Sequence, residues 1–205
     1  MDALTSTTSA ELYELVRAAV GEALAARRCL VLFTGAALGY RDAVEQLRAL
    51  SAQGAQLTYT QTTSARQVLD QELMRSVGMV PADQSWLGDA GTLIVATMTA
   101  NAAAKAARGI ADCHASSLMA EAIKQGLTVV AVTSGADPES PEMRRHYPKM
   151  PAAYAEAMRA DLASLAGFGV RLATAQNLRD VVCAAWGATA PPDLRTESPG
   201  RLSLT

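Results

Sequence analysis

Short hydrophobic runs alternate with amphipathic segments along most of this chain. Apolar runs of strand length occur at 29–33, 92–96, 127–132 and 170–173, and residues 56–60, QLTYT, form a further short segment of strand length. Segments in which apolar residues recur every three or four positions occur at 36–52, 64–76, 111–124, 152–165 and 177–186. This spacing predicts strands for the first set and helices for the second. Strands that alternate with helices indicate a parallel sheet, and strands that are apolar throughout indicate helices on both of its faces.

We therefore expect a single α/β domain over residues 29–186, and both a Rossmann-like and a flavodoxin-like order of parallel strands satisfy the pattern. Residues 187–205 are interpreted as a C-terminal tail. The segment 133–151 holds Pro138, Pro141, Pro148 and Pro151 and is predicted to be a long loop. Loops of this length in compact domains are usually functional or mobile.

An amphipathic helix is predicted at the N-terminus, within residues 1–28. Thr8 and Glu11 have the spacing of a capping box, and an apolar stripe runs from Leu12 to Leu24. The helix lies outside the alternating pattern of strands and helices. Two interpretations remain: it contacts another subunit of a larger assembly, or it folds back onto the sheet.

The amino-acid composition disfavours several classes of partner and of site. Half of the 205 residues are hydrophobic and the formal net charge is −2, with no cluster of Lys or Arg. A nucleic-acid or membrane-surface partner is therefore disfavoured. Cys29, Cys113 and Cys183 are widely spaced, which argues against a disulfide framework and against a metal site. With no secretory signal and no apolar run of about 18 residues, we expect a soluble, cytoplasmic protein.

Three predicted strand ends carry small or hydroxylated residues: Thr34, Gly35 and Ala36; Thr60, Thr62 and Thr63; and Thr97, Met98, Thr99, Ala100 and Asn101. Ligands of an open parallel sheet bind beyond the carboxyl ends of its strands. Glycine lets the backbone approach a ligand, and the following helix start favours an anion, so these turns suit a phosphate. Each turn alone also fits an ordinary helix N-cap. The chain contains neither GxGxxG nor GxxxxGK[ST].

The segment TANAAAKAARGIAD, residues 99–112, resembles the (P)-x-S/T-A-N-T-x-x-K-x-x-x-G-x-x-D segment of a flavoprotein family. That family contains phosphopantothenoylcysteine decarboxylase and the lantibiotic peptide cysteine decarboxylases. The matching positions are Thr99, Ala100, Asn101, Lys105, Gly109 and Asp112. The first turn, LFTGAALGYRDAVEQLRAL, is similar to the family's VTGSIAAYKALELLRLL, and TQTTSARQVL is similar to its T-x-x-A-x-x-F/L. The resemblance covers about residues 29–135 and, more weakly, extends to 175.

The resemblance implies a Rossmann-like, FMN-binding subunit of a homotrimer, often assembled further into a dodecamer, with the flavin between neighbouring subunits. Gly35 and Ala36, after Thr34, would face the phosphate, with help from Thr60, Thr62 and Thr63. Residues Thr97 to Asn101 would line the isoalloxazine or the substrate. The alanines that follow would let helices approach closely across a subunit boundary, although helix propensity alone also explains them.

The chain departs from the family where decarboxylation is carried out. An ungapped count places Asp83 at the family's catalytic histidine, TSGADPESPEM replaces the P-x-M-N-x-x-M/W loop, and Thr97 replaces a proline. The candidate catalytic residues are Asn101, Asp83 and His146. Asp83 lies in an acidic stretch around Trp86 that either gates the flavin or is simply solvated. His146 either meets an anionic substrate or is an exposed loop histidine.

We therefore expect an FMN-binding, homo-oligomeric flavoprotein that performs redox chemistry on a small substrate or transfers electrons. It would be a flavin-dependent oxidoreductase or a lyase-related enzyme. The alternatives are flavin storage or delivery without turnover, flavin prenyltransferase activity and cysteine decarboxylase activity. Met143 and Met150 would cover the flavin ring or pack in the core.

Overall fold

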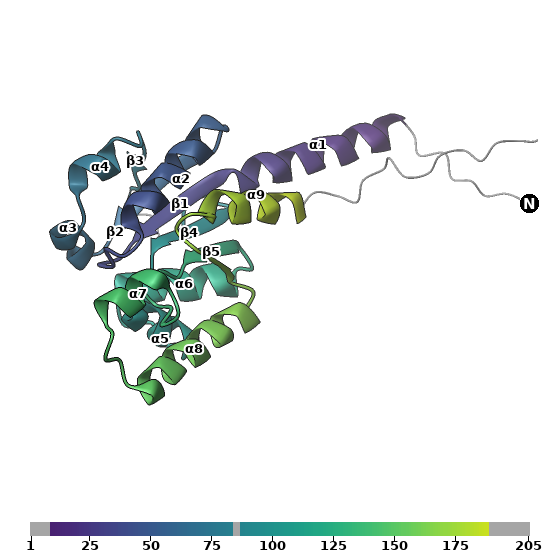
Figure 1. The fold of residues 1–205 in the computed structure, drawn as a ribbon. Helices are drawn as coiled ribbons and strands as arrows, with labels where there is room; N and C mark the ends of the chain where they lie inside the picture. Colours follow the sequence, from purple (N-terminus) through teal and green to yellow (C-terminus); the bar gives the residue numbers. More distant parts are fainter. Residues whose placement is uncertain (1–8, 84–86, 189–205) are drawn as a thin grey trace, which may run out of the picture.

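The computed structural model describes residues 9–83 and 87–188 of the chain (Figure 1). Its parallel strands are β1 (Arg28–Phe33), β2 (Gln56–Gln61), β3 (Val80–Pro81), β4 (Thr92–Thr97), β5 (Thr128–Val132) and β6 (Arg171–Ala173). They form a sheet of order β3-β2-β1-β4-β5-β6. This is the Rossmann order. Strands β2 and β3 follow β1 on one side and strands β4 to β6 follow on the other side, so the order of the strands reverses between β1 and β4. The predicted parallel α/β fold is confirmed, and the flavodoxin-like order is not the one observed.

The helices are α1 (Ser9–Ala26), α2 (Tyr40–Ala52), α3 (Thr63–Val68), α4 (Gln71–Arg75), α5 (Ala100–Ala107), α6 (His114–Lys124), α7 (Pro141–His146), α8 (Ala152–Gly167) and α9 (Leu178–Ala188). Figure 1 shows α2 and α9 on one side of the sheet and α5, α6 and α8 on the other. Two hydrophobic clusters correspond to these layers. Helices cover both faces of the sheet, as the apolar strands predicted.

Strand β1 shows how the sequence builds both layers. Val31 and Phe33 pack with α2 and α9, whereas Leu30 and Leu32 pack with α5 and α6. Successive side chains of a strand point to opposite faces, so an apolar run is buried on both sides. Four of these residues are at most 2 % exposed, and the central strands therefore form a rigid support for the turns that follow them.

Several predicted segments differ from the structure. The helix expected over 36–52 begins only at Tyr40, after the N-cap Gly39, and α9 includes residues 187 and 188 of the expected tail. The helix expected over 64–76 is divided into α3 and α4, because the Asp70 carboxylate accepts hydrogen bonds from the amides of Glu72 and Leu73 and starts a new helix. The loop expected over 133–151 contains α7, which the Ser140 hydroxyl caps and Pro141 begins. Both helices have six residues or fewer, too few for apolar periodicity to reveal.

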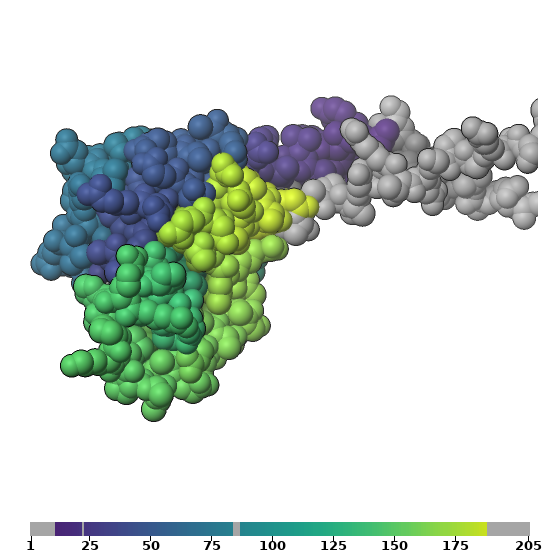
Figure 2. All heavy atoms as spheres, in the orientation of Figure 1, coloured from purple at the N-terminus to yellow at the C-terminus, as the bar shows by residue number. Residues whose placement is uncertain are grey.

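Helix α1 extends away from the body of the molecule (Figures 1 and 2). Its C-terminal end is fixed, because Ala26 O accepts a hydrogen bond of 2.8 Å from Thr92 Oγ1. Gly91 packs so closely there that an added Cβ would lie 2.5 Å from Ala25 O. The helix does not fold back onto the sheet. Among the described helices, none combines the length and the hydropathy needed to cross a bilayer.

Candidate functional site

A cleft of about 870 Å³ lies beyond the carboxyl ends of β1, β4 and β5. Gly35 follows β1, Thr99 follows β4 and Gly135 follows β5, and all three line the cleft. The cleft spans the ends of β1 and β4, between which the order of the strands reverses. Ligands of open α/β sheets bind at this kind of point, and the volume is within the usual range for a small-molecule site.

Thr34 and Thr97 join the tips of β1 and β4 beneath the cleft. Thr34 N donates to Thr97 Oγ1 at 2.9 Å, and Thr97 Oγ1 donates to Thr34 O at 2.8 Å. The Thr34 hydroxyl also donates to Thr97 O and accepts from Thr99 N. Both residues are buried. Their hydroxyls therefore hold the two turns in register, and neither residue lines the cleft itself.

The floor of the cleft is packed too tightly for side chains. A Cβ added to Gly135 would lie 2.6 Å from Ala36 Cβ and 2.7 Å from Met98 O. A Cβ added to Gly35 would lie 2.8 Å from Ser64 Cβ. Contacts below 3.0 Å are not tolerated between such atoms, so the backbones of the three turns meet only because both positions are glycine. The space above them stays open.

Backbone amides without hydrogen-bond acceptors gather in the turn after β1. Among the described residues, the N–H groups of Gly35, Ala36, Ala37 and Leu38 have no hydrogen-bond acceptor. All four residues line the cleft, and α2 begins directly after them. Free amides at a helix start bind anions, because the N–H dipoles and the helix dipole both favour negative charge. The turn therefore has the donors that a phosphate requires.

The walls combine soft apolar side chains with basic and aromatic ones. They are formed by Val68 of α3, Asn101 of α5, and residues of α7, α8 and the turn between them: Met143, His146, Tyr147, Pro148, Lys149, Met150, Pro151, Tyr154 and Met158. The ring centroids of His146 and Tyr147 are 4.8 Å apart in an edge-to-face contact. No carboxylate is among the described lining residues. The site thus favours an anionic ligand with a flat apolar part.

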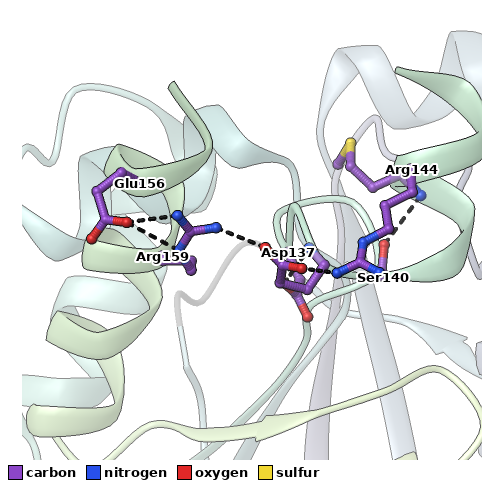
Figure 3. Close-up of polar contacts among 7 residues, drawn as sticks. Asp137, Ser140, Arg144, Glu156 and Arg159 are labelled. Atoms are coloured by element: carbon purple, nitrogen blue, oxygen red, sulfur yellow. Dashed lines mark hydrogen bonds and ion pairs between the residues drawn. The ribbon is translucent and has the colours of Figure 1, made fainter. Parts of the chain in front are cut away.

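Ion pairs hold the α7 wall against α8 from outside (Figure 3). Arg159 donates to Glu139 at 2.7 Å and to Glu156 at 2.6 Å, and Arg144 pairs with the same Glu139 carboxylate. Asp137 Oδ1 accepts from Glu139 N at 2.8 Å. Burial raises the pKa of Asp137, and the nearby charges of Arg144 and Arg159 oppose that rise. One glutamate therefore links two segments that form the wall.

The structure brings together about half of the predicted site residues. Gly35, Ala36, Thr99, Ala100, Asn101 and His146 line one cleft, together with Met143 and Met150. The other candidates do not line it. Met98 is fully buried in the core, Thr60 Oγ1 is 2.9 Å from His114 Nε2, and Thr62 caps α3 by accepting from Ala65 N. Thr63 is exposed at the start of α3.

Asp83 is not in this cleft. It lines a separate hollow of about 540 Å³ with Arg28, Gln56 and Val80. An ungapped count could not anticipate this place, because the chain leaves β3 there and returns to the start of β4. Trp86, expected to form a gate with Asp83, lies outside the described residues.

The later positions of the segment 99–112, which match the flavoprotein family, have a structural role in this chain. Lys105 Nζ donates to Asp112 Oδ1 at 2.8 Å, and the pair closes the turn after α5, where Gly109 has a φ of +69°. The hydrogen bond to Asp112 raises the pKa of Lys105, and the same bond lowers the pKa of Asp112. These positions fix the chain between α5 and α6, whereas Asn101 faces the cleft.

Several lining residues were not predicted from the sequence. Tyr154 and Met158 fall within the regular periodicity of α8, which gives no sign that they face a cleft. Val68 ends a short helix, and Gly135 follows β5 by three residues. A signal did exist for Gly135, Tyr147 and Lys149, since all three lie in the long proline-rich segment that was expected to be functional.

No protein-family model and no curated protein matches this chain. Solved structures do. The FMN-dependent cysteine decarboxylase SpaF has a TM-score of 0.57 at 20% identity, and the match covers 82% of this chain and 99% of that one. The fold is that of the FMN-dependent cysteine decarboxylases.

Two further structures share this fold. DmrB from Burkholderia xenovorans, solved with FMN and described as a cubic protein cage for redox transfer, has a TM-score of 0.53 at 20% identity, with 78% of this chain and 93% of that one covered. A dodecameric FMN-dependent UbiX-like decarboxylase from Escherichia coli O157:H7 has a TM-score of 0.52 at 16% identity, with 83% and 99% covered. Each of these matches covers more than nine-tenths of the solved chain and about four-fifths of this one.

Proposed function

We propose that this protein is an FMN-binding flavoprotein that works as a homo-oligomer and uses the flavin for redox chemistry on a small substrate or for electron transfer. The observation that carries the proposal is the set of backbone amides from Gly35 to Leu38, which have no acceptor among the described residues and whose residues line a cleft of about 870 Å³. Similar folds that bind FMN support it, although a fold alone does not determine function.

The residues of the cleft fit the two parts of FMN. The amides after β1 would hold the phosphate, in the absence of carboxylates that would repel it. Met143, Met150 and Tyr154 would contact the flat ring, and Asn101 would donate to or accept from its polar edge. When bound, the flavin supplies hydride and electron transfer.

His146 would exchange a proton with the substrate. Its imidazole lines the cleft, and histidine is the side chain that most often acts as a general acid or base in enzymes. Tyr147 packs edge-to-face against it and restrains the ring. A positioned proton donor favours an enzyme over flavin storage, whereas a carrier needs only the phosphate and ring contacts.

A neighbouring subunit would complete the cleft. Val68, Tyr147 and Tyr154 line it and are 52–59 % exposed, so its rim presents apolar surface to solvent. Burying such a rim against a second copy would exclude water from the flavin. A trimer, assembled in some cases into a dodecamer, would meet this need, and one of the similar structures is dodecameric.

Turnover can be tested with purified protein loaded with FMN. We expect the flavin to be reduced by dithionite or NAD(P)H and reoxidised by an added acceptor, with absorbance near 450 nm as the readout. His146→Gln should slow substrate turnover about 100-fold or more without loss of FMN, because it removes the proton donor alone. Bound flavin that never turns over, with His146→Gln indistinguishable from wild type, would instead support storage or delivery.

A further inference from the structure

Helix α1 leaves its apolar face uncovered. Leu12, Val16, Val20 and Leu24 are 52–60 % exposed, and Tyr13 and Leu15 are more exposed still. They account for half of the large hydrophobic side chains exposed on the described residues. Figure 2 shows the helix projecting from the body, where no other described element packs along it. An apolar face of this size indicates an interaction surface.

We propose that α1 pairs antiparallel with α1 of a second copy of this chain. The apolar ridge has a palindromic order: Leu12, Val16, Val20 and Leu24 are spaced by four residues and read the same in both directions. Ridges of this spacing pack into the equivalent grooves of another helix. In a two-fold pair, Leu12 of each copy therefore meets Leu24 of the other, and Val16 meets Val20.

The neighbouring row of the helix provides the groove. Ala19 and Ala23 lie beside the ridge, one turn apart, and their small side chains leave room for the ridge of the other copy. An antiparallel arrangement also opposes the two helix dipoles. Because α1 has 18 residues and is about 27 Å long, the two bodies lie at opposite ends of the pair and do not collide.

Other occupants fit this face less well. The described side chains of the helix include Glu11 and Glu14 against the single basic residue Arg17, whereas helices that lie on membranes are rich in Lys and Arg. Residues 189–205 contain only three large apolar residues, Leu194, Leu202 and Leu204, together with three prolines. A second copy provides a matching apolar ridge. The proposal does not depend on flavin binding.

The mass of the full-length protein tests the pairing. We expect Val16→Glu to lower the particle mass measured by sedimentation velocity by a factor of two or more, because it places a charge in the centre of the pair. Ala18→Glu is the matched control. It adds the same charge two residues further on, about 200° around the helix, and should leave the mass of the wild type unchanged.

Equal masses for wild type and Val16→Glu would overturn the proposal. So would a mass that rises when residues 189–205 are removed, since that result would mean that this segment covers the face. Circular dichroism should show both glutamate variants folded. FMN binding should be the same in wild type and Val16→Glu, which separates a failure of this proposal from a failure of the proposed function.

A disulfide test fixes the register. Val16→Cys and Val20→Cys are prepared separately in a background in which the exposed Cys113 is replaced by serine. Oxidising the mixture should give a cross-link between the two variants, several-fold more than either variant gives alone. A stronger cross-link within Val16→Cys alone would indicate parallel helices and would contradict the antiparallel pair.

Discussion

Glycine at position 135 is what lets three strand ends meet under the cleft. Gly135 O accepts from Ala100 N at 3.1 Å, and its Cα faces Ala36 and the Met98 carbonyl. A side chain at this position would have to displace backbone, which cannot give way cheaply. Steric contacts therefore restrict this position to glycine. The hydrogen-bond donors at the floor of the cleft are backbone amides rather than side chains.

We predict that Gly135→Ala destabilises the protein by about 1–3 kcal/mol through overpacking and weakens FMN binding at least 10-fold. Gly167→Ala is the control, because an added Cβ there meets nothing within 4 Å and improves helix propensity at the end of α8. Urea unfolding and an FMN titration measure both effects. Equal stability of the two variants would show that the floor can relax.

Alkaline pH should lower the stability of the protein because the Cys29 thiol is buried. Burial raises the pKa of this thiol from 9.0 to about 12. The unfolded chain releases the proton above about pH 9 while the folded chain keeps it. The free energy of unfolding should therefore be unaffected below pH 9 and fall by about 1.4 kcal/mol per pH unit between pH 9 and 12.

Cys29→Ala should remove the fall between pH 9 and 10 and the part of the fall above pH 10 that is due to the thiol, measured by urea unfolding at pH 8, 10 and 11. Burial also raises the pKa of Tyr40 to about 12, helped by Asp70. Tyr40→Phe should therefore remove only the loss that begins above pH 10. An unchanged pH dependence in Cys29→Ala would mean that the thiol ionises without cost in the folded protein.

At the scale of elements, the short helix α7 turns a loop into a wall. Its outer face is tied to α8 through Glu139, which binds both Arg144 and Arg159. These side chains are largely exposed, so each pair adds little to global stability. Arg144 lies in the same helix as Met143 and His146, so we expect the network to restrain this wall of the cleft more than it stabilises the fold.

Glu139→Gln should loosen this wall. We expect amide exchange over residues 141–147 to increase several-fold, while the melting temperature changes by no more than about 2 °C. Hydrogen exchange with mass spectrometry measures the first quantity and calorimetry the second. Glu142→Gln serves as control, because Glu142 lies three residues further on, in the first turn of α7, and has no ion pair among the described residues. Identical exchange in the two variants would exclude the network as a restraint.

Elements with long apolar patterns were predictable and short ones were not. The buried runs of β1 and β4 identify the sheet, and the rule that ligands bind at strand ends identifies Gly35 and Asn101. Neither α7 nor the break at Asp70 could be found from periodicity, because capping side chains define them. Thr34 and Thr97 were expected at the cofactor, but only the structure reveals that their hydroxyls bond to each other's strand.

The whole molecule combines a rigid sheet, a cleft at its point of reversal and a helix that extends outward. The sheet and the cleft belong to a fold that also carries FMN-dependent decarboxylases and a redox cage. The projecting α1 has an apolar face suited to assembly. This arrangement is the basis of the proposed flavin site and of the proposed pairing through α1.

The central claim is that the amides after β1 hold the phosphate of FMN. Isothermal titration of the purified protein with FMN and with riboflavin tests it most directly, because the two ligands differ only in the phosphate. We predict that FMN binds at least about 100-fold more tightly, as expected for several hydrogen bonds to a charged group. Equal affinity for the two ligands, or binding of neither, would contradict the account.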